Sequence, residues 1–191
     1  MSGQPLTSLS AVQRFLSLSG GTDDELLTEL IARTSDGIRS YCGREFAAAD
    51  YHEHHDGDGS DTVLLEQRPA LEVFALSEDG AAVADDDFVV YPELGMVRLK
   101  SGVFRRGERN VYAGYRAGYE VIPGDVEQAA IQWTAALYQA RGAAGGRDIK
   151  SERVGDYAVT YDGGEDEGEP APAGARSLLE PYRIALARPV R

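Results

Sequence analysis

The sequence predicts an α+β fold, in which a helical core is interrupted by a block of short antiparallel strands and followed by an extended C-terminal segment. Three observations predict it. Apolar residues recur at helical spacing before residue 43 and again from residue 125. Between residues 51 and 119, apolar and polar residues alternate, and turns rich in Gly and Asp separate the alternating runs. Beyond an acidic stretch rich in Pro and Gly, the chain becomes amphipathic once more.

Two helices are predicted first, at residues 8–18 and 23–42, and the short linker between them favours a helical hairpin. The apolar face of the first helix consists of Leu9, Val12, Phe15 and Leu16. The buried face of the second consists of Leu27, Leu30, Ile31, Thr34, Ile38 and Tyr41. Thr22 and Glu25 are spaced as a capping box at the start of the second helix. Gly43 can adopt the left-handed conformation that ends a helix.

About six short strands follow, which favours a meander or a small barrel-like sheet. The Gly- and Asp-rich residues 56–61 separate strands predicted at residues 51–56 and 62–65, and this pattern is typical of a hairpin. Asp79 and Gly80 predict a second turn. Further strands are expected at residues 71–77, 88–91, 96–100 and 110–115.

A third helix is predicted at residues 125–141, after Pro123, whose fixed φ suits a helix start. Its apolar face consists of Val126, Ala130, Trp133 and Leu137. Residues 154–161 alternate like one more strand. The chain is therefore divided into a main domain with the strands inserted at 51–119, an acidic flexible linker and a docking segment, at residues 1–161, 162–174 and 175–191.

The C-terminal segment is amphipathic, and Pro181 interrupts it, which predicts a turn followed by a short helix. A segment of this kind beyond a flexible linker either folds back on its own domain or is kept for a partner protein. The reach that the linker permits favours the partner. The residues expected to form the docking interface are Leu178, Leu179, Tyr182, Arg183, Leu186 and Arg188.

The charge of the chain excludes some functions. A formal net charge of −13 argues against a sequence-reading nucleic-acid binder, whose binding surface would be basic. No apolar run approaches the roughly 20 residues that cross a bilayer, so no membrane partner is expected. Cys42 is the only cysteine, which excludes an internal disulfide. Its place at the end of an apolar helical face predicts a small buried hydrophobe.

All three histidines lie at the start of the first predicted strand, where His52, His54 and Asp56 share one face. These side chains offer nitrogen and oxygen ligands to a metal, but no other His and no Cys pair completes the set, so a solvated edge strand is favoured. Residues 56–61 differ from a calcium loop because position six is Asp61 instead of Gly. No nucleophile–base pair and no nucleotide-binding loop occurs in the sequence. No cofactor, no metal and no enzymatic activity are therefore expected.

Four stretches, in matching order along the chain, carry a resemblance to a known family. They are the end of the helical pair at residues 38–46, the run 56–65 followed by Arg68-Pro69, the run 115–129 that leads into the third helix, and residues 154–161 with 178–183 near the C-terminus. On these residues the chain resembles the head-tail connectors, or adaptors, of tailed bacteriophages, which join the portal to the tail.

The resemblance implies a structural protein without catalytic residues, whose helical core carries an inserted β-region and assembles as a dodecameric ring beneath the portal. DNA passes through the lumen of such a ring without sequence-specific binding. The C-terminal segment of these connectors inserts into the portal, which is the contact implied for the docking residues named above. A downstream head-completion or tail protein, a place at the head–tail interface of the virion and assembly in the host bacterial cytoplasm are also implied. A prophage or gene-transfer particle is an equally good source. The alternative is a metal-dependent or hydrolytic enzyme that uses His52, His54 and Asp56.

Overall fold

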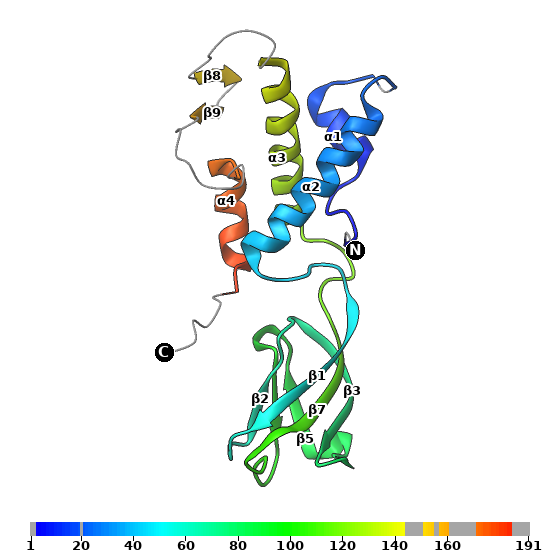
Figure 1. Cartoon of the computed structure of the whole chain (residues 1–191), viewed down its shortest axis with the longest axis vertical. Coiled ribbons are helices and arrows are strands. Elements are labelled where there is room, and N and C mark those ends of the chain that lie inside the picture. The colour runs from blue at the N-terminus through cyan, green and yellow to red at the C-terminus, as the bar shows by residue number, and fades with distance from the viewer. Residues whose placement is uncertain (1–2, 20, 144–150, 155–156, 161–170, 185–191) are drawn as a thin grey trace. The chain divides into compact units, whose positions relative to one another are not determined.

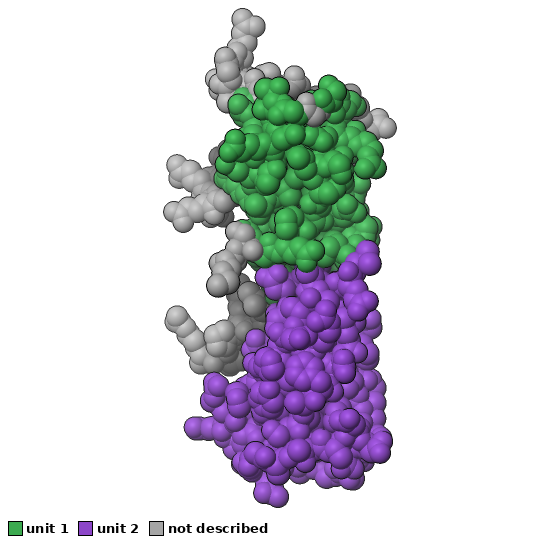
Figure 2. All heavy atoms as spheres, turned by 90° about the vertical axis from the view of Figure 1, so that its right-hand side faces the viewer, with its two compact units in different colours: residues 1–44, 122–191 green, residues 45–121 purple. Residues whose placement is uncertain are grey.

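The computed structural model describes residues 3–19, 21–143, 151–154, 157–160 and 171–184. The chain divides into two compact units, which Figure 2 colours separately. Helices dominate the first unit, drawn from residues 1–44 and 122–191, and strands dominate the second, residues 45–121. We call them the helical unit and the strand unit. Their contents confirm the predicted α+β class.

The helical unit contains helices α1 (Leu9–Leu16), α2 (Asp24–Cys42), α3 (Gly124–Ala143) and α4 (Ala173–Leu179), with the short 3-10 turn η3 (Glu180–Tyr182) after α4. Helix α3 contacts each of the other three helices. Strands β8 (Ser151–Val154) and β9 (Tyr157–Thr160) pair antiparallel, where the sequence predicts one strand over residues 154–161. The three predicted helices are all present. Among the described residues, no helix is long and apolar enough to span a bilayer.

The ends of the first two helices agree only in part with the sequence prediction. The side chain of Ser8 caps α1 by accepting a hydrogen bond from the Ala11 backbone N–H at 3.2 Å. The capping box predicted at α2 is wrong, because Asp23 instead of Thr22 is the N-cap residue and its side chain makes no capping hydrogen bond. At the other end, Gly43 has a φ of 66° and ends α2 as predicted.

The core of the helical unit lies where α1, α2 and α3 meet, around Val12, Leu27, Ile31 and Ile131. Phe15 was expected on the buried face of α1 but is 50% exposed, because Leu9, Val12 and Leu16 already fill the contact of this short helix and Phe15 lies at its edge. Leu30 and Tyr41, expected on the buried face of α2, are half-buried.

Helices α2 and α3 approach closely at two neighbouring places. The buried hydroxyls of Thr34 and Thr134 are hydrogen-bonded at 2.9 Å. One helical turn further along α2, Gly37 lies against the Trp133 ring: a Cβ atom there would sit 2.8 Å from Cη2. Gly37 therefore provides the space that the indole ring occupies.

The strand unit consists of two antiparallel sheets (Figure 1). The four-stranded sheet has the order β1-β7-β3-β4, and the three-stranded sheet has the order β2-β6-β5. The bounds are β1 Ala49–Gly57, β2 Thr62–Leu64, β3 Ala70–Glu78, β4 Ala81–Ala82, β5 Phe88–Tyr91, β6 Met96–Leu99 and β7 Gly107–Ala117. Two short 3-10 turns, η1 (Asp85–Asp87) and η2 (Pro92–Leu94), flank β5.

The hairpin predicted around residues 56–61 is wrong, whereas the turn predicted at Asp79 and Gly80 is present. Strand β1 pairs with β7 and β2 pairs with β6, so residues 58–61 join two different sheets and do not close a hairpin. Asp79 and Gly80 do form the turn between β3 and β4, with φ values of 49° and 80°.

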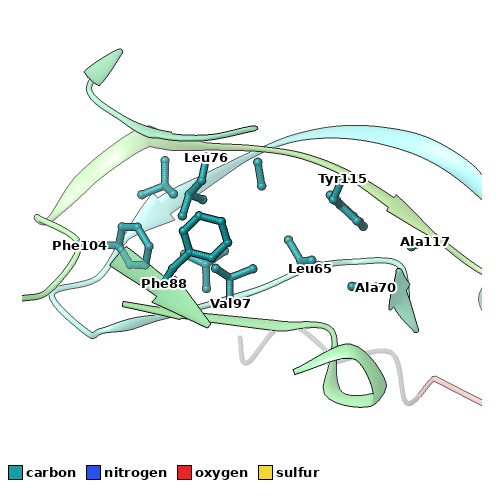
Figure 3. Packing of buried hydrophobic residues seen from close by; sticks show 11 residues of the cluster. Leu65, Ala70, Leu76, Phe88, Val97, Phe104, Tyr115 and Ala117 are labelled. Carbon is teal, nitrogen blue, oxygen red and sulfur yellow. The ribbon is translucent and has the colours of Figure 1, made fainter. Parts of the chain in front are cut away.

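The core of the strand unit fills the space between the two sheets (Figure 3). Both sheets and the loops that join them supply its buried side chains, which are Val63, Leu65, Ala70, Leu76, Phe88, Val97, Phe104, Val111, Ala113, Tyr115 and Ala117. Because side chains alternate along a strand, the residues between the inward-facing positions point away from the core.

Candidate functional site

The C-terminal segment packs on its own unit. Figure 1 shows α4 beside α3, and the two helices are in contact. Ala175 and Leu179 of α4 are fully buried. At the end of α2, the Cys42 sulfur lies 4.0 Å from the Leu179 carbonyl oxygen, and the Cys42 carbonyl accepts a 2.8 Å hydrogen bond from the Ile184 N–H. The segment is therefore held at both its helix and its last described residue.

Three polar side chains surround this contact. The Tyr41 hydroxyl donates to the Glu180 carboxylate at 3.1 Å, and the Arg183 guanidinium lies 4.9 Å from the centroid of the Tyr41 ring. Arg183 also donates to Glu180 at 3.3 Å. Burial, and then the bond to the carboxylate, raises the pKa of Tyr41 above its usual value. The three groups fix one another and present an aromatic ring and a cation at the surface.

The predicted docking residues separate into three groups. Leu179 is 0% exposed and is a core residue of the helical unit, so in this structure its side chain is not available to another protein. Leu178 and Tyr182 are half-buried, and Arg183 is exposed. Leu186 and Arg188 lie outside the described residues. The helix of this segment also precedes Pro181, where the sequence predicts a helix after it.

The linker predicted at residues 162–174 falls mostly outside the described residues, which resume at residue 171. Helix α4 begins at Ala173, within the range assigned to the linker. The Arg176 backbone N–H donates to the Pro172 carbonyl at 3.0 Å, which closes the first turn, and the Arg176 side-chain Nε donates to the Ala171 carbonyl at 2.6 Å. The order of the segment therefore starts before residue 175.

His52, His54 and Asp56 of β1 each contact a neighbouring residue of the sheet. His52 Nδ1 is 2.7 Å from the Tyr112 hydroxyl, and the Asp56 carboxylate accepts a hydrogen bond from the Arg109 backbone N–H at 2.6 Å. The His54 ring lies 5.2 Å from the Tyr112 ring, centroid to centroid. Within the described ranges, no group of three or more His, Cys, Asp or Glu side chains is placed to hold a metal ion. The ligand set required by the enzyme alternative is not assembled.

The inner face of β1 carries a polar network that the sequence analysis missed. Buried Tyr115 of β7 donates to Glu53 and accepts a hydrogen bond from the Gln67 N–H at 3.0 Å. Glu53 also accepts from the Glu66 N–H at 3.2 Å, and His55 Nε2 lies 3.1 Å from the same carboxylate oxygen. The sequence signal for this network is the alternation of Tyr51, Glu53 and His55, which places the Glu53 carboxylate on the same strand face as an aromatic ring that packs inward.

Burial and hydrogen bonding act in opposite directions on Glu53. Burial, the largest influence, opposes ionisation, but the bonds from His55, Tyr115 and the Glu66 backbone together outweigh it and lower the pKa of Glu53. Burial and the bond to Glu53 raise the pKa of Tyr115 far above its usual value. The network joins β1, β7 and the 65–69 connection, so its role is to stabilise the strand unit.

The chain matches the family model for head completion proteins over residues 5–185. No curated protein matches the chain. Three similar solved chains come from gene transfer agent particles, and the likeness in each case is one of fold.

The first comes from the neck of an empty particle computed with C6 symmetry: it is 16% identical, with a TM-score of 0.64, over 100% of this chain and 97% of that one. The second comes from the virion of a native particle: it is 15% identical, with a TM-score of 0.60, over 98% of this chain and 97% of that one. The third comes from the neck of a native particle computed with C12 symmetry: it is 15% identical, with a TM-score of 0.58, over all of both chains.

Proposed function

Because the chain belongs to the head completion protein family and is a structural head–tail connector, we propose that it forms a ring beneath the portal of a tailed phage or phage-like particle. The family match over residues 5–185 carries this proposal. The likeness to chains from particle necks with cyclic symmetry supports a ring, and we propose the dodecameric form. The ring extends the DNA channel and provides the platform for a downstream head-completion or tail protein. Its place is the virion, after assembly in the host bacterial cytoplasm.

The charge of the chain suits a DNA conduit. Proteins that grip DNA do so mainly by neutralising phosphates with Lys and Arg. This chain has 32 acidic and only 19 basic residues, so a ring of it carries a large excess of carboxylates. We propose that the channel wall is acidic or neutral, which lets duplex DNA slide without being held.

The portal contact is proposed for the exposed part of the C-terminal segment. Leu179 anchors the segment to the helical unit, which leaves Leu178, Tyr182 and Arg183 to face a partner. Leu186 and Arg188 follow these residues in the sequence and are proposed for the same contact. The Arg183 guanidinium is already held over the Tyr41 ring. Binding of a partner would therefore cost little additional side-chain conformational entropy at Arg183.

The test is to delete the gene from the particle system that encodes the chain and to restore it with variants. Loss of the protein should leave DNA-filled heads without tails in electron micrographs, and the wild-type gene should restore the tails. Arg183→Glu should reduce tail attachment while the purified variant unfolds at the wild-type denaturant concentration. The control is Arg14→Glu, an exposed arginine on α1 of the same helical unit, outside the C-terminal segment. Tailed particles formed without the protein would refute the proposed function.

The alternative of a metal-dependent or hydrolytic enzyme gains no support from the geometry. His52 and Asp56 are engaged by neighbouring residues of the sheet, and no third ligand joins them among the described residues. The family and the neck structures both point to a structural protein.

A further inference from the structure

The outer face of the four-stranded sheet carries a cluster of rings, which we call the Phe74 patch: the exposed His52, His54 and Phe74, and the half-buried Tyr112. The His52 ring lies 5.7 Å from the Phe74 ring and 6.1 Å from the Tyr112 ring, centroid to centroid. Phe74 is 45% exposed and lies within a break in register between β3 and β7, which falls between Val73 and Ala75. Its ring lies over Gly114, where a Cβ atom would be 2.7 Å from it. The rings therefore form one continuous aromatic surface.

The outer face of the three-stranded sheet carries a second apolar surface, the Leu64 patch: Leu64, Val89, Tyr91 and Met96. Register places Leu64 opposite Met96, and Met96 opposite Tyr91, so these three side chains cross the sheet in one row. Leu64 is 66% exposed, and Val89 and Tyr91 are also exposed. The alternate residues Val63 and Val97 are buried between the sheets, which confirms that the row points away from the core.

Each patch is bordered by an ion pair that neutralises a carboxylate. Arg116 and Asp50, 2.8 Å apart, lie next to the Phe74 patch on the same sheet face. Arg98 and Asp61, 2.7 Å apart, lie next to the Leu64 patch. In a chain with a net charge of −13, two like copies repel unless uncompensated carboxylates are kept out of the contact. The two ion pairs reduce the negative charge beside each patch, while the exposed Asp56 carboxylate, two residues after His54 on β1, accepts a hydrogen bond from the Arg109 N–H.

The two sheets enclose one core, so the two patches lie on opposite faces of the strand unit. A closed ring requires heterologous contacts, in which one surface of each copy meets a different surface of the next. We propose that the Phe74 patch of one copy packs on the Leu64 patch of its neighbour in the ring. This inference rests on the proposed function, since it names the subunit contact of that ring. Each copy supplies one patch to each neighbour, so the contact repeats around the ring.

Two substitutions test the two patches independently. Phe74→Asp should disable the first patch and Leu64→Asp the second, because each places a charge in an apolar contact. Both side chains are exposed, so both variants should fold with the wild-type circular dichroism spectrum. Val103→Asp is the control, since Val103 is 54% exposed in the same unit and lies on a loop outside both patches. Sedimentation over a concentration series should show self-association of the wild type and the control, weakened by at least about tenfold in each patch variant.

Mixing the two variants tests the direction of the contact. Each variant keeps the patch that the other lacks, so a mixture should form one-to-one heterodimers that grow no further, while each variant alone stays monomeric. The proposal is supported if heterodimers form in the mixture and each variant by itself stays monomeric. The proposal is overturned if either variant associates like the wild type, if the mixture stays monomeric, or if the wild type is monomeric at its highest soluble concentration. Failure of the proposed function would give a different result: the wild-type protein would still self-associate, but tailed particles would form in its absence.

Discussion

Leu179→Ala is the most direct test of how the C-terminal segment is held. Leu179 is fully buried, packs at the end of α2 near Cys42, and belongs to a helix of only seven residues. A helix of that length is marginal alone and depends on its packing. Removal of a fully buried leucine side chain costs about 2–5 kcal/mol of unfolding free energy, depending on how far the cavity collapses. We expect Leu179→Ala to destabilise the helical unit by that amount.

The assay is denaturant unfolding followed by tryptophan fluorescence. Trp133 is the only tryptophan of the chain and lies on α3, 8% exposed, so its emission reports on the helical unit and not on the strand unit. The matched control is Leu178→Ala, the same substitution at the neighbouring half-buried position, which should cost about 1 kcal/mol or less. If the two variants unfold at the same denaturant concentration, α4 is not part of the core and the reasoning fails.

Three further predictions follow from single contacts. Gly37→Ala should destabilise the helical unit by about 1–3 kcal/mol in the same fluorescence assay, because the new Cβ atom meets the Trp133 ring; an unchanged midpoint would show that the ring moves freely. Because the pKa of Glu53 is lowered from its usual 4.5, its ionisation stabilises the strand unit above that pH. This stability should be lost as the pH falls through the lowered value, and Glu53→Gln should flatten the decline measured by circular dichroism melts. Burial raises the pKa of Cys42 to about 11, so a thiol reagent at neutral pH should label it only at the rate of unfolding; immediate labelling would contradict its burial.

Local sequence patterns predicted most of the elements and few of the long-range pairings. The helix over residues 23–42 and the strand over residues 88–91 depend on spacing within one segment, and both are present. The pairing of β1 depends on β7, whose paired residues lie 50 to 68 positions further along the chain, from Gly57↔Gly107 to Ala49↔Ala117. Nothing within residues 51–65 distinguishes a hairpin from a crossing between sheets. The capping box at Thr22 failed for a similar reason. The Asp24 side chain accepts hydrogen bonds from the Gly21 N–H and from the side chain of Gln13 on α1. With this contact in place, α2 begins at residue 24, one residue later than predicted.

The candidate surfaces were less predictable than the fold. Apolar residues such as Leu64 and Phe74 read as ordinary strand residues in the sequence, and only the register of each sheet shows that they face solvent. The role of Leu179 depends on the space beside Cys42, which α2 and α3 create together. Sequence periodicity placed Leu179 on an apolar face correctly but could not say whether its own chain or a partner covers that face.

The packing of the C-terminal segment changes how a portal contact would form. A segment that is disordered before binding loses roughly 1–2 kcal/mol of backbone conformational entropy for each residue that it orders. Burial of Leu179 and the hydrogen bond from Ile184 to Cys42 already order residues 171–184 in the folded chain. These residues therefore lose little further backbone entropy when a portal binds. The affinity for a portal would then come from the exposed side chains, above all Arg183. Removal of residues 175–191 would open the core at Cys42 and lose stability and attachment together. A charge reversal at Arg183 leaves Leu179 in place, and for that reason it separates docking from folding.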